Sequence, residues 1–497
     1  MHSLTLLLLL PVLGAAIIAV LPGRSQNLIR KTALAISTIT LIYAFSFLLV
    51  FDASSSALQF SKIIPWNTRL GTSFALGIDG ISFAMILLAT LLSFIAILTS
   101  HIIQERIKGY YLLMLLLESA MLGVFMAQDW SLFYVFWELT LIPLFFLIDR
   151  WGGKRRSIAS LNFVLYTMGG SVFMLLSLLV LFDATPGHSF AMDDILVGAR
   201  TLPEHTQILI FLGFLIGFGV KMPIFPIHGW LPLAHVEAPS PVSILLSGIL
   251  LKMGAYGLIR AAYVLPEAVL SLQTVLMVLA LFSLIYGGLL AWRQSDLKGM
   301  IAYSSVSHMG VVLLGIAALN ITGLTGALMQ MVAHGLVAGA LFLLIGLLYE
   351  RTHTREITDY SSLVKVTPRF ALFTSLAFIA AVGIPGTAGF IAELHVIIGA
   401  FEQWGWAVIL VTIGVMISAA YAARTMGRLF TGPSRANMSD ISDLQTVEMF
   451  AASILVLGFL FLGFFPAYAL DLMAASAAKF SQLFSEQMVA QTLTGVM

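Results

Sequence analysis

The sequence predicts an all-α integral membrane protein with about fourteen transmembrane helices. The 497 residues are 60% hydrophobic and only 10% charged, whereas an average soluble domain carries roughly 25% charged residues. Apolar runs of about 20 residues recur along the chain, and that length crosses a bilayer as a helix. Hydrocarbon offers the backbone no hydrogen-bond partner, and the runs show no strict alternation, so we expect helices rather than barrel strands.

The expected spans are separated by polar loops. They lie near residues 3–21, 31–50, 80–100, 110–127, 130–149, 160–182, 206–227, 241–263, 270–291, 301–318, 323–349, 370–398, 406–430 and 447–475. Because the first span has only His2 among polar residues before it and is followed by further spans, we interpret it as a retained helix and not as a signal peptide.

The charged residues of the loops predict an orientation. Lys and Arg follow the odd-numbered spans, the seventh excepted: Arg24, Arg30, Lys31, Arg106, Lys108, Lys154, Arg155, Arg156, Arg293, Lys298, Arg351, Arg355, Arg428 and Arg435. The opposite loops are mostly acidic, with Asp129, Asp193, Asp194, Glu204, Glu267 and Glu402. Loops rich in Lys and Arg stay on the cytoplasmic side, so both termini are expected on the lumenal or periplasmic side.

Composition excludes several function classes. The net charge of +1 gives no indication of nucleic acid binding. The chain has no cysteine, which excludes cysteine-bound iron–sulfur clusters and thiol chemistry within it. No metal-ligand spacing and no phosphate-binding loop stands out. We therefore expect no cofactor or metal in this chain, and electron-transfer centres, where relevant, belong to partners.

Two spans are interrupted by proline and glycine at matching positions. The seventh is interrupted at 221–226 (Lys-Met-Pro-Ile-Phe-Pro) and the twelfth at 383–389 (Gly-Ile-Pro-Gly-Thr-Ala-Gly). Each is the fourth of five consecutive spans, a pattern typical of inverted-repeat transporters with binding chemistry at the midplane. The predicted organisation is therefore three spans in 1–109, a first inverted repeat in 110–263, a second in 264–430, and a last span with a tail in 431–497.

Ionisable residues inside the spans form the candidate site. A charge at the bilayer centre costs roughly 2.5–3.5 kcal/mol on insertion scales, so it is rarely present without a function or a partner. The candidates are Glu138 in the fifth span, Lys221 before the first interruption, Lys252 in the eighth span, Glu393 after the second interruption, and His308 and His334 in the tenth and eleventh spans.

These residue types can pass a proton along. Burial favours the neutral form of a lysine and a nearby carboxylate favours the charged form, so a glutamate that approaches or leaves can load or unload the lysine. We hypothesise that Glu138 tunes Lys221 and that Lys252 relays at the centre. Glu393 is then the terminal donor or acceptor. The two histidines can bridge, because histidine titrates nearest neutral pH.

Structural roles compete with this hypothesis. One buried Glu or Lys can be half of an interhelical pair, but four at comparable depth, two of them beside interruptions, favour a functional role. Each of the two histidines can simply hydrogen-bond a neighbouring helix. His228 and His235 flank an expected loop, and we leave them outside the core site. Glu118, inside the fourth span, can pair with a neighbouring helix or chain.

Five segments around these residues resemble the antiporter-like subunits of complex I. They are 136–143 (Phe-Trp-Glu-Leu-Thr-Leu-Ile-Pro), 220–223 (Val-Lys-Met-Pro), 228–232 (His-Gly-Trp-Leu-Pro), 250–260 (Leu-Leu-Lys-Met-Gly-Ala-Tyr-Gly-Leu-Ile-Arg) and 302–310 (Ala-Tyr-Ser-Ser-Val-Ser-His-Met-Gly). Glutamate at 393 resembles the M-type, or chain 4, subunit, because L- and N-type relatives usually have lysine there. Segments 151–156 (Trp-Gly-Gly-Lys-Arg-Arg) and 165–173 (Leu-Tyr-Thr-Met-Gly-Gly-Ser-Val-Phe) look closer to the D subunit of the photosynthetic NDH complex of cyanobacteria and chloroplasts.

The resemblance implies a proton-translocating subunit without a redox centre of its own. Peripheral subunits would pass electrons from reduced ferredoxin or NAD(P)H to a quinone such as plastoquinone, so iron–sulfur clusters and quinone would lie in partner subunits. Neighbouring membrane chains would be of the F and B types. The implied location is a cyanobacterial thylakoid membrane, with a bacterial plasma membrane as the alternative.

Two departures from the family pattern suggest a specialised paralogue. The family commonly has aspartate where this chain has Leu233, and Asp149-Arg150 adds a charge pair beside the fifth span. The D-type variants of cyanobacterial carbon dioxide-uptake complexes are such paralogues. That form would add a peripheral carbon dioxide-hydration module as a partner, and proton flux would help drive carbon dioxide to bicarbonate.

Two other functions compete with a complex I subunit. A subunit of a multi-subunit Mrp-type cation/proton antiporter shares the fold and the lysines, although Glu393 argues mildly against it. A structural membrane anchor without an ion path is the other alternative, and the repeated interruption of helices beside charged residues argues against it.

Overall fold

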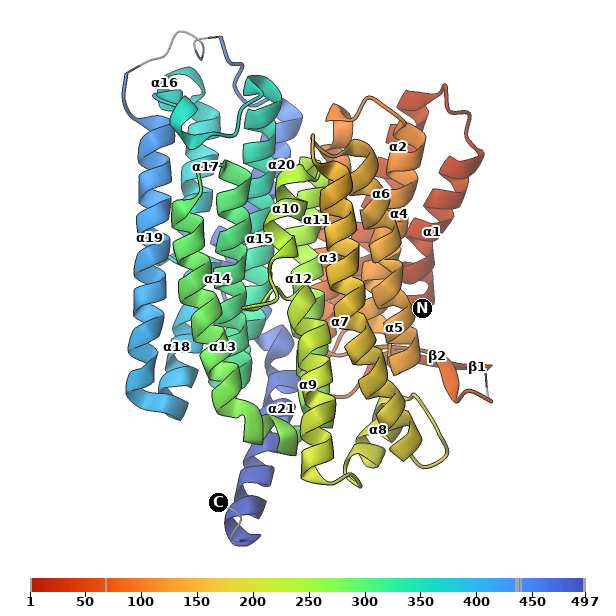
Figure 1. The fold of residues 1–497 in the computed structure, drawn as a ribbon. Coiled ribbons are helices and arrows are strands. Elements are labelled where there is room, and N and C mark those ends of the chain that lie inside the picture. The colour runs from red at the N-terminus through yellow and green to blue at the C-terminus, as the bar shows by residue number, and fades with distance from the viewer. Residues whose placement is uncertain (1, 68, 434–437, 439, 495–497) are drawn as a thin grey trace.

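The protein folds as a bundle of long helices aligned along one axis (Figure 1). The structure is a computed structural model that describes residues 2–67, 69–433, 438 and 440–494. Among these residues, 11 helical segments are long and apolar enough to cross a membrane, and α1 (Leu4–Val20) and α17 (Pro368–Ala381) are shorter apolar helices. The predicted helical membrane fold is confirmed, and the number of fourteen spans stays a prediction.

The helices divide between the two halves of the chain. The first half contains α1, α2 (Gln26–Ser46), α3 (Gly80–Leu98), α4 (Ile107–Met126), α5 (Trp130–Leu139), α6 (Leu141–Trp151), α7 (Arg156–Ala184), α8 (Met192–Ala199), α9 (Glu204–Lys221), α10 (Trp230–Glu237), α11 (Ser240–Leu245) and α12 (Leu251–Val264). The second half contains α13 (Pro266–Arg293), α14 (Leu297–Ala317), α15 (Ile321–Thr352), α16 (Leu363–Val366), α17, α18 (Ala388–Trp404), α19 (Ile409–Phe430), α20 (Thr446–Phe464) and α21 (Ala467–Thr494).

Both predicted interruptions are present as breaks between helices. The first separates α9 from α10 at residues 222–229, and the second separates α17 from α18 at residues 382–387. Proline lacks the backbone N–H that a helix interior needs, and glycine adopts backbone conformations that other residues avoid. The broken helices are therefore dictated locally by the Pro- and Gly-rich segments, and the inverted symmetry of the two repeats stays a prediction.

Other spans differ from the expected single helices. The fifth is divided at Thr140 into α5 and α6, and the last is divided at Phe465-Pro466 into α20 and α21. The eighth contains a π-helical turn, Leu246–Leu250, between α11 and α12. Such turns widen the hydrogen-bonded ring by one residue and are frequent at functional sites.

A β-hairpin lies at the end of the bundle from which the C-terminal helix extends (Figure 1). Strand β1 (Gln59–Asn67) pairs antiparallel with β2 (Thr72–Ile78), and most of β1 is exposed while the end of β2 is buried. We predicted no strand in this segment, because a short, partly polar hairpin gives a much weaker hydropathy signal than a membrane span.

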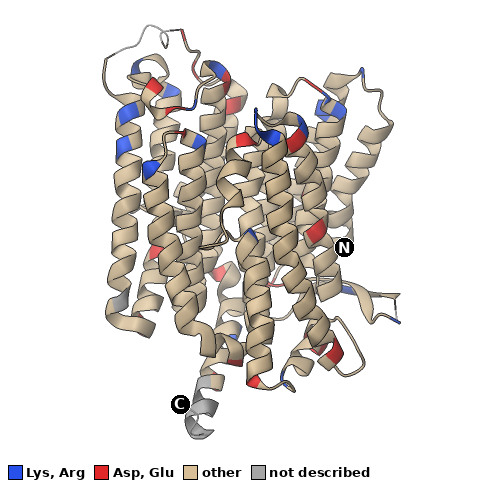
Figure 2. Ribbon diagram, in the orientation of Figure 1, with Lys and Arg blue, Asp and Glu red and all other residues tan. Residues whose placement is uncertain are grey.

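The charges of the loops are separated between the two ends of the bundle. Figure 2 shows most Lys and Arg at one end, and Figure 1 shows the start of α1 and the C-terminal helix towards the other. This polarity matches the predicted loop pattern, apart from Arg435, which lies outside the described residues. The side of a membrane that each end faces stays a prediction.

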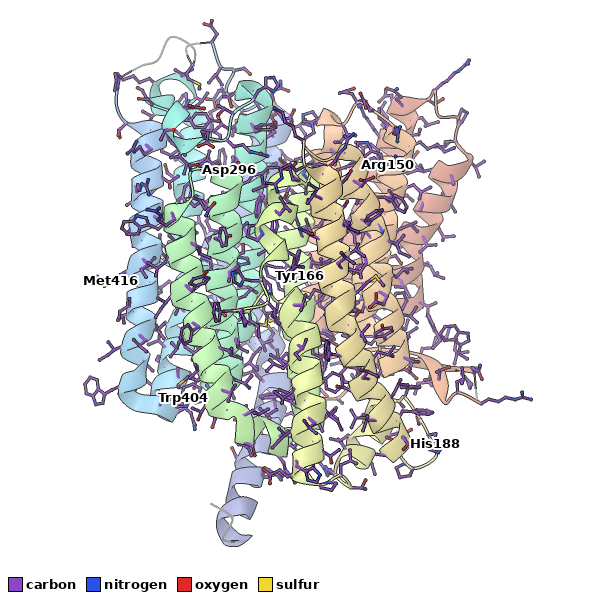
Figure 3. The ribbon with its side chains drawn as sticks, in the orientation of Figure 1. Arg150, Tyr166, His188, Asp296, Trp404 and Met416 are labelled. Carbon is purple, nitrogen blue, oxygen red and sulfur yellow. The ribbon has the colours of Figure 1, made fainter. Side chains whose placement is uncertain are left out.

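Apolar side chains cover the outside of the bundle as well as its interior. Figure 3 shows Met416 pointing outward from α19, and 71% of its surface is exposed. Close helix packing in the interior depends on glycine: a Cβ atom at Gly254 of α12 would lie 2.6 Å from the backbone nitrogen of Met222. This close approach holds α12, which carries Lys252, against the first helix break.

Candidate functional site

Lys252 lies at the centre of a buried polar cluster. Its side chain is fully buried in α12, and its Nζ donates a hydrogen bond of 2.6 Å to the carbonyl oxygen of Ser247. That carbonyl belongs to the π-helical turn that precedes α12. The same Nζ lies 2.6 Å from Nδ1 of His334 in α15. Two of the predicted site residues, Lys252 and His334, are therefore in direct contact.

Two serines close a ring around this pair. Nε2 of His334 lies 3.2 Å from Oγ of Ser305 in α14, and Ser305 lies 3.1 Å from Oγ of Ser247. Both serines are fully buried, and buried polar groups in proteins are normally hydrogen-bonded. We did not predict either serine as a site residue, because isolated serines are common in membrane helices and give no distinctive sequence signal.

His308 links this ring to Glu393. The rings of His308 and His334 are 5.3 Å apart between centroids. Nδ1 of His308 lies 3.8 Å from Oε1 of Glu393 and 3.2 Å from Nε2 of Gln330. A small cavity, about the size of one water molecule, is lined by His308, His334, Gln330 and Glu393. Four predicted residues therefore form one buried line across α12, α15, α14 and α18.

The second helix break positions Glu393. Gly383 has a φ of +74°, and a Cβ atom there would lie 2.6 Å from Oε2 of Glu393. Only glycine adopts this backbone conformation without strain, and only glycine leaves room for the carboxylate. The break that the sequence predicted thus opens the space that Glu393 occupies at the start of α18.

Lys221 occupies a different pocket, at the junction of α5 and α6. Its Nζ donates to Oγ1 of Thr140 at 3.0 Å and to the carbonyl oxygen of Trp137 at 3.3 Å. It also lies 3.8 Å from the centroid of the Trp137 ring, a cation–π geometry. Among the described residues, no hydrogen bond joins Lys221 to Lys252 or to the groups around Lys252.

Glu138 does not form an ion pair with Lys221. Their charged atoms are beyond the 4.0 Å limit of an ion pair. Glu138 is only partly buried, and its Oε1 is enclosed without a hydrogen-bond partner in the part of the chain that the structure describes. The role of Glu138 in tuning Lys221 stays a prediction, and the sequence did not predict that Thr140 and Trp137 hold the lysine.

Glu118 is another buried carboxyl group of the first half. It is fully buried in α4, and neither carboxylate oxygen has a hydrogen-bond partner among the described residues. The structure thus gives no ion-pair partner for it within the described chain. Over the same described ranges, no group of three or more His, Asp or Glu side chains is arranged to hold a metal ion.

Comparisons with known proteins agree with this architecture. Residues 127–418 match the family described as NADH:quinone oxidoreductase/Mrp antiporter, TM. NAD(P)H-quinone oxidoreductase chain 4 2 of Thermosynechococcus vestitus is 41% identical over 478 residues, covering 94% of this chain and 89% of that protein. A chain of respiratory complex I from Thermus thermophilus has a TM-score of 0.89 and 32% identity, covering 97% of this chain and 100% of that one.

A more distant structure shares the fold alone. A chain of the Mrp complex from Dietzia sp. DQ12-45-1b superposes with a TM-score of 0.83 at 21% identity, covering 99% of this chain and 56% of that one.

Proposed function

Because this chain belongs to the family of membrane subunits shared by NADH:quinone oxidoreductases and Mrp antiporters, we propose that it moves protons across a membrane within a complex I-like NAD(P)H- or ferredoxin-dependent quinone oxidoreductase. One observation carries the proposal: Lys252, His334, His308 and Glu393 form a buried line of titratable groups. Intramembrane ionisable groups in contact with one another are typical of proton relays.

The line can transfer a proton in three steps. A protonated Lys252 donates its Nζ–H to Nδ1 of His334 and becomes a neutral amine, while the imidazole becomes an imidazolium. The proton then passes to the neighbouring ring of His308, with the intervening polar groups or water as carriers. His308 finally delivers it to the carboxylate of Glu393, which is neutralised.

Glu138 and Lys221 fit the tuning role better than a direct transfer role. Lys221 is held by Thr140 and Trp137, so its proton has no hydrogen-bonded route to Lys252 in this conformation. Glu138 lies beyond ion-pair distance of Lys221, so the tuning that we propose acts without a direct ion pair. A change in that carboxylate, from protonation or from a neighbouring chain, would shift the charge state of Lys221.

The assembly and location follow from the same proposal. The chain is a subunit of a membrane complex, and we propose F-type and B-type antiporter-like chains as its neighbours, with iron–sulfur clusters and quinone in other subunits. We propose a cyanobacterial thylakoid membrane, with the Lys- and Arg-rich end towards the cytoplasm and both termini in the lumen.

A narrower assignment is the carbon dioxide-uptake form, with a peripheral hydration module as an extra partner. Its support is one of the two departures noted in the sequence, the pair Asp149-Arg150, whereas Leu233 is partly buried against the core. Asp149 and Arg150 form an ion pair of 3.5 Å at the exposed Lys- and Arg-rich end, where a soluble module can dock. Copurification tests it: a hydration module should accompany this chain together with an F-type subunit.

The substitution Lys252→Ala tests the proposed function. In membrane vesicles that contain the assembled complex, we expect the loss of quinone-linked proton pumping, while sodium transport is unaffected. Assembly is checked by native gel electrophoresis of the same membranes. The reverse outcome, with sodium transport lost and quinone-linked pumping intact, would instead identify an Mrp-type antiporter subunit.

A further inference from the structure

Ser305 is a fully buried residue of α14 whose hydroxyl contacts the histidine beside Lys252. Its Oγ lies 3.2 Å from Nε2 of His334 in α15 and 3.1 Å from Oγ of Ser247 in the π-helical turn. The same hydroxyl donates a hydrogen bond of 3.1 Å to the carbonyl oxygen of Ile301, one turn earlier in α14. Ser305 therefore joins three elements of the central cluster through one oxygen atom.

The contact with Lys252 determines which nitrogen of His334 carries the hydrogen. A protonated lysine has three N–H donors and no acceptor. Nδ1 of His334, 2.6 Å from Nζ of Lys252, must therefore be the ring nitrogen without a hydrogen. The hydrogen of the neutral ring is then on Nε2, so Oγ of Ser305 is the acceptor of that N–H group.

The hydroxyl of Ser305 can make all of its contacts at the same time. A hydroxyl has one donor and two acceptor positions. Its hydrogen is donated to the carbonyl oxygen of Ile301, and its two lone pairs accept from Nε2 of His334 and from the hydroxyl of Ser247. Because the hydrogen of Ser305 is already used, these bonds hold Ser305 as an acceptor towards His334.

We propose that Ser305 is a positioning residue that keeps Nδ1 of His334 open to the proton of Lys252. The inference rests on the proposed function, in which Lys252 gives its proton to His334. In that step an N–H bond of Lys252 breaks and the Nδ1–H bond of His334 forms, which leaves a neutral amine and an imidazolium. The Nε2–H group stays bound to Ser305, and this hydrogen bond strengthens as the ring becomes charged. Ser305 thus favours the product of the transfer without exchanging a proton itself.

Two neighbouring serines of α14 lack these contacts. Ser304 donates 2.8 Å to the carbonyl oxygen of Ile301, and Ser307 donates 2.7 Å to the carbonyl oxygen of Leu284. Both are buried, but within the described part of the chain no hydrogen bond joins either of them to His334. The position opposite His334, and not the presence of a buried serine in α14, distinguishes Ser305.

The test uses membrane vesicles that contain the assembled complex, with proton pumping and quinone reduction followed together. Ser305→Cys keeps the size of the side chain but offers only a weak acceptor, and Ser305→Ala removes the acceptor. We expect both to lower pumping about tenfold, because a hydrogen bond to a charged ring is weakened or lost. Ser305→Thr keeps the hydroxyl and should restore pumping to near normal. The matched control is Ser307→Cys, in the same helix and also buried, which should pump normally.

Infrared spectra supply a readout that a packing role would not change. The two neutral tautomers of histidine absorb at different frequencies, and the band of His334 is identified in complex with isotope-labelled histidine as the one that His334→Gln removes. We expect the Nε2–H form in the unsubstituted complex and in Ser307→Cys. Ser305→Cys should show a mixture of both forms, because the Nε2–H group has lost its strong acceptor.

Lys252→Ala, measured in parallel, separates this inference from the proposed function. Reduced pumping in Ser305→Cys together with an altered His334 band, with Ser307→Cys unchanged, supports the role of Ser305. Normal pumping or an unchanged band in assembled Ser305→Cys, with Lys252→Ala inactive, overturns that role alone. Normal pumping in Lys252→Ala overturns the proposed function.

Discussion

The two helix breaks carry their charged residues in different ways. At the first, Lys221 ends α9 and is enclosed by Thr140 and Trp137, without a hydrogen bond to the central cluster among the described residues. At the second, Glu393 follows the break and lies 3.8 Å from His308, at the end of a line that reaches Lys252. The two breaks match in sequence position, but their charged residues have different contacts. Lys221 is not hydrogen-bonded to the central cluster among the described residues, whereas Glu393 lies beside His308.

We expect the largest effect from removing the carboxylate of Glu393, which ends the line from Lys252. Glu393→Gln keeps the shape of the side chain but cannot exchange a proton, so quinone-linked proton pumping should fall about 100-fold. Proton uptake by vesicles that contain the assembled complex measures it. The control is Glu402→Gln, an exposed carboxylate of the same helix that should leave pumping unchanged. Near-normal pumping by Glu393→Gln would show that protons do not leave by the second break.

The two histidines test whether the line acts as one unit. His308→Gln and His334→Gln should each reduce pumping about tenfold, because each removes a proton carrier between Lys252 and Glu393. The double variant should be little worse than the more severe single variant, since residues that act in one line are not additive. Fully additive losses, measured in the same vesicle assay, would mean that the histidines serve separate routes.

Gly383 tests whether the break itself positions the carboxylate. Gly383→Ala should cost about 1–2 kcal/mol for a left-handed backbone and should push the Glu393 carboxylate aside. We expect about fivefold slower pumping, because the accepting carboxylate of Glu393 is displaced from His308. Gly427→Ala is a matched control, because nothing lies within 4 Å of a Cβ atom there. Equal activity of both variants would argue that Glu393 does not need its present position.

The first break should show a smaller, indirect effect. If Glu138 acts only by tuning Lys221, Glu138→Gln should slow pumping a few-fold, and the same change should have no further effect in a Lys221→Ala background. A double-mutant cycle of pumping rates measures this coupling. Unaltered proton transfer in both single variants, with assembly intact, would favour a structural anchor.

The smallest effect on pumping is expected outside the relay, at Asp79. Burial raises the pKa of Asp79, but the Arg260 guanidinium and hydrogen bonds from Ser82 more than offset this and hold the pKa below its ordinary value. A lowered pKa stabilises the fold at neutral pH, and that contribution is lost as the pH falls through the folded value. Asp79→Asn leaves Arg260 without its 2.8 Å partner and should destabilise the complex by about 3 kcal/mol.

Thermal unfolding of the purified complex measures the Asp79→Asn effect, and pumping at low temperature should stay within about twofold of normal. Asp52→Asn serves as the exposed control, since that carboxylate accepts hydrogen bonds from neighbouring Ser54 and Asp52 lies on the surface. A Tm as low for Asp52→Asn as for Asp79→Asn would contradict a specific role of the buried pair.

The sequence predicted the helices and their breaks better than the contacts between side chains. Helical spans and both breaks follow from local hydropathy and from proline and glycine, so they were predictable. The contact of Lys252 with His334 depends on how α12 packs on α15, which no local pattern encodes. Thr140 was missed because a threonine hydroxyl is an ordinary helix residue until a lysine is placed 3.0 Å from it.

His235 shows what hydropathy along the chain does not reveal. The sequence places this histidine beside an expected loop, and loops usually lie at the surface. The helix α10 instead packs between α7 and α14, and its histidine is fully buried. A short helix that follows a break can return into the core, and hydropathy averaged over a span does not reveal this.

The most direct test of the central claim is an experimental structure of the assembled complex at a resolution that shows ordered water. The account predicts water in the small cavity between His308 and Glu393, with Lys252 still bound to His334. A dry cavity, with Glu393 turned away from His308 towards lipid, would contradict it.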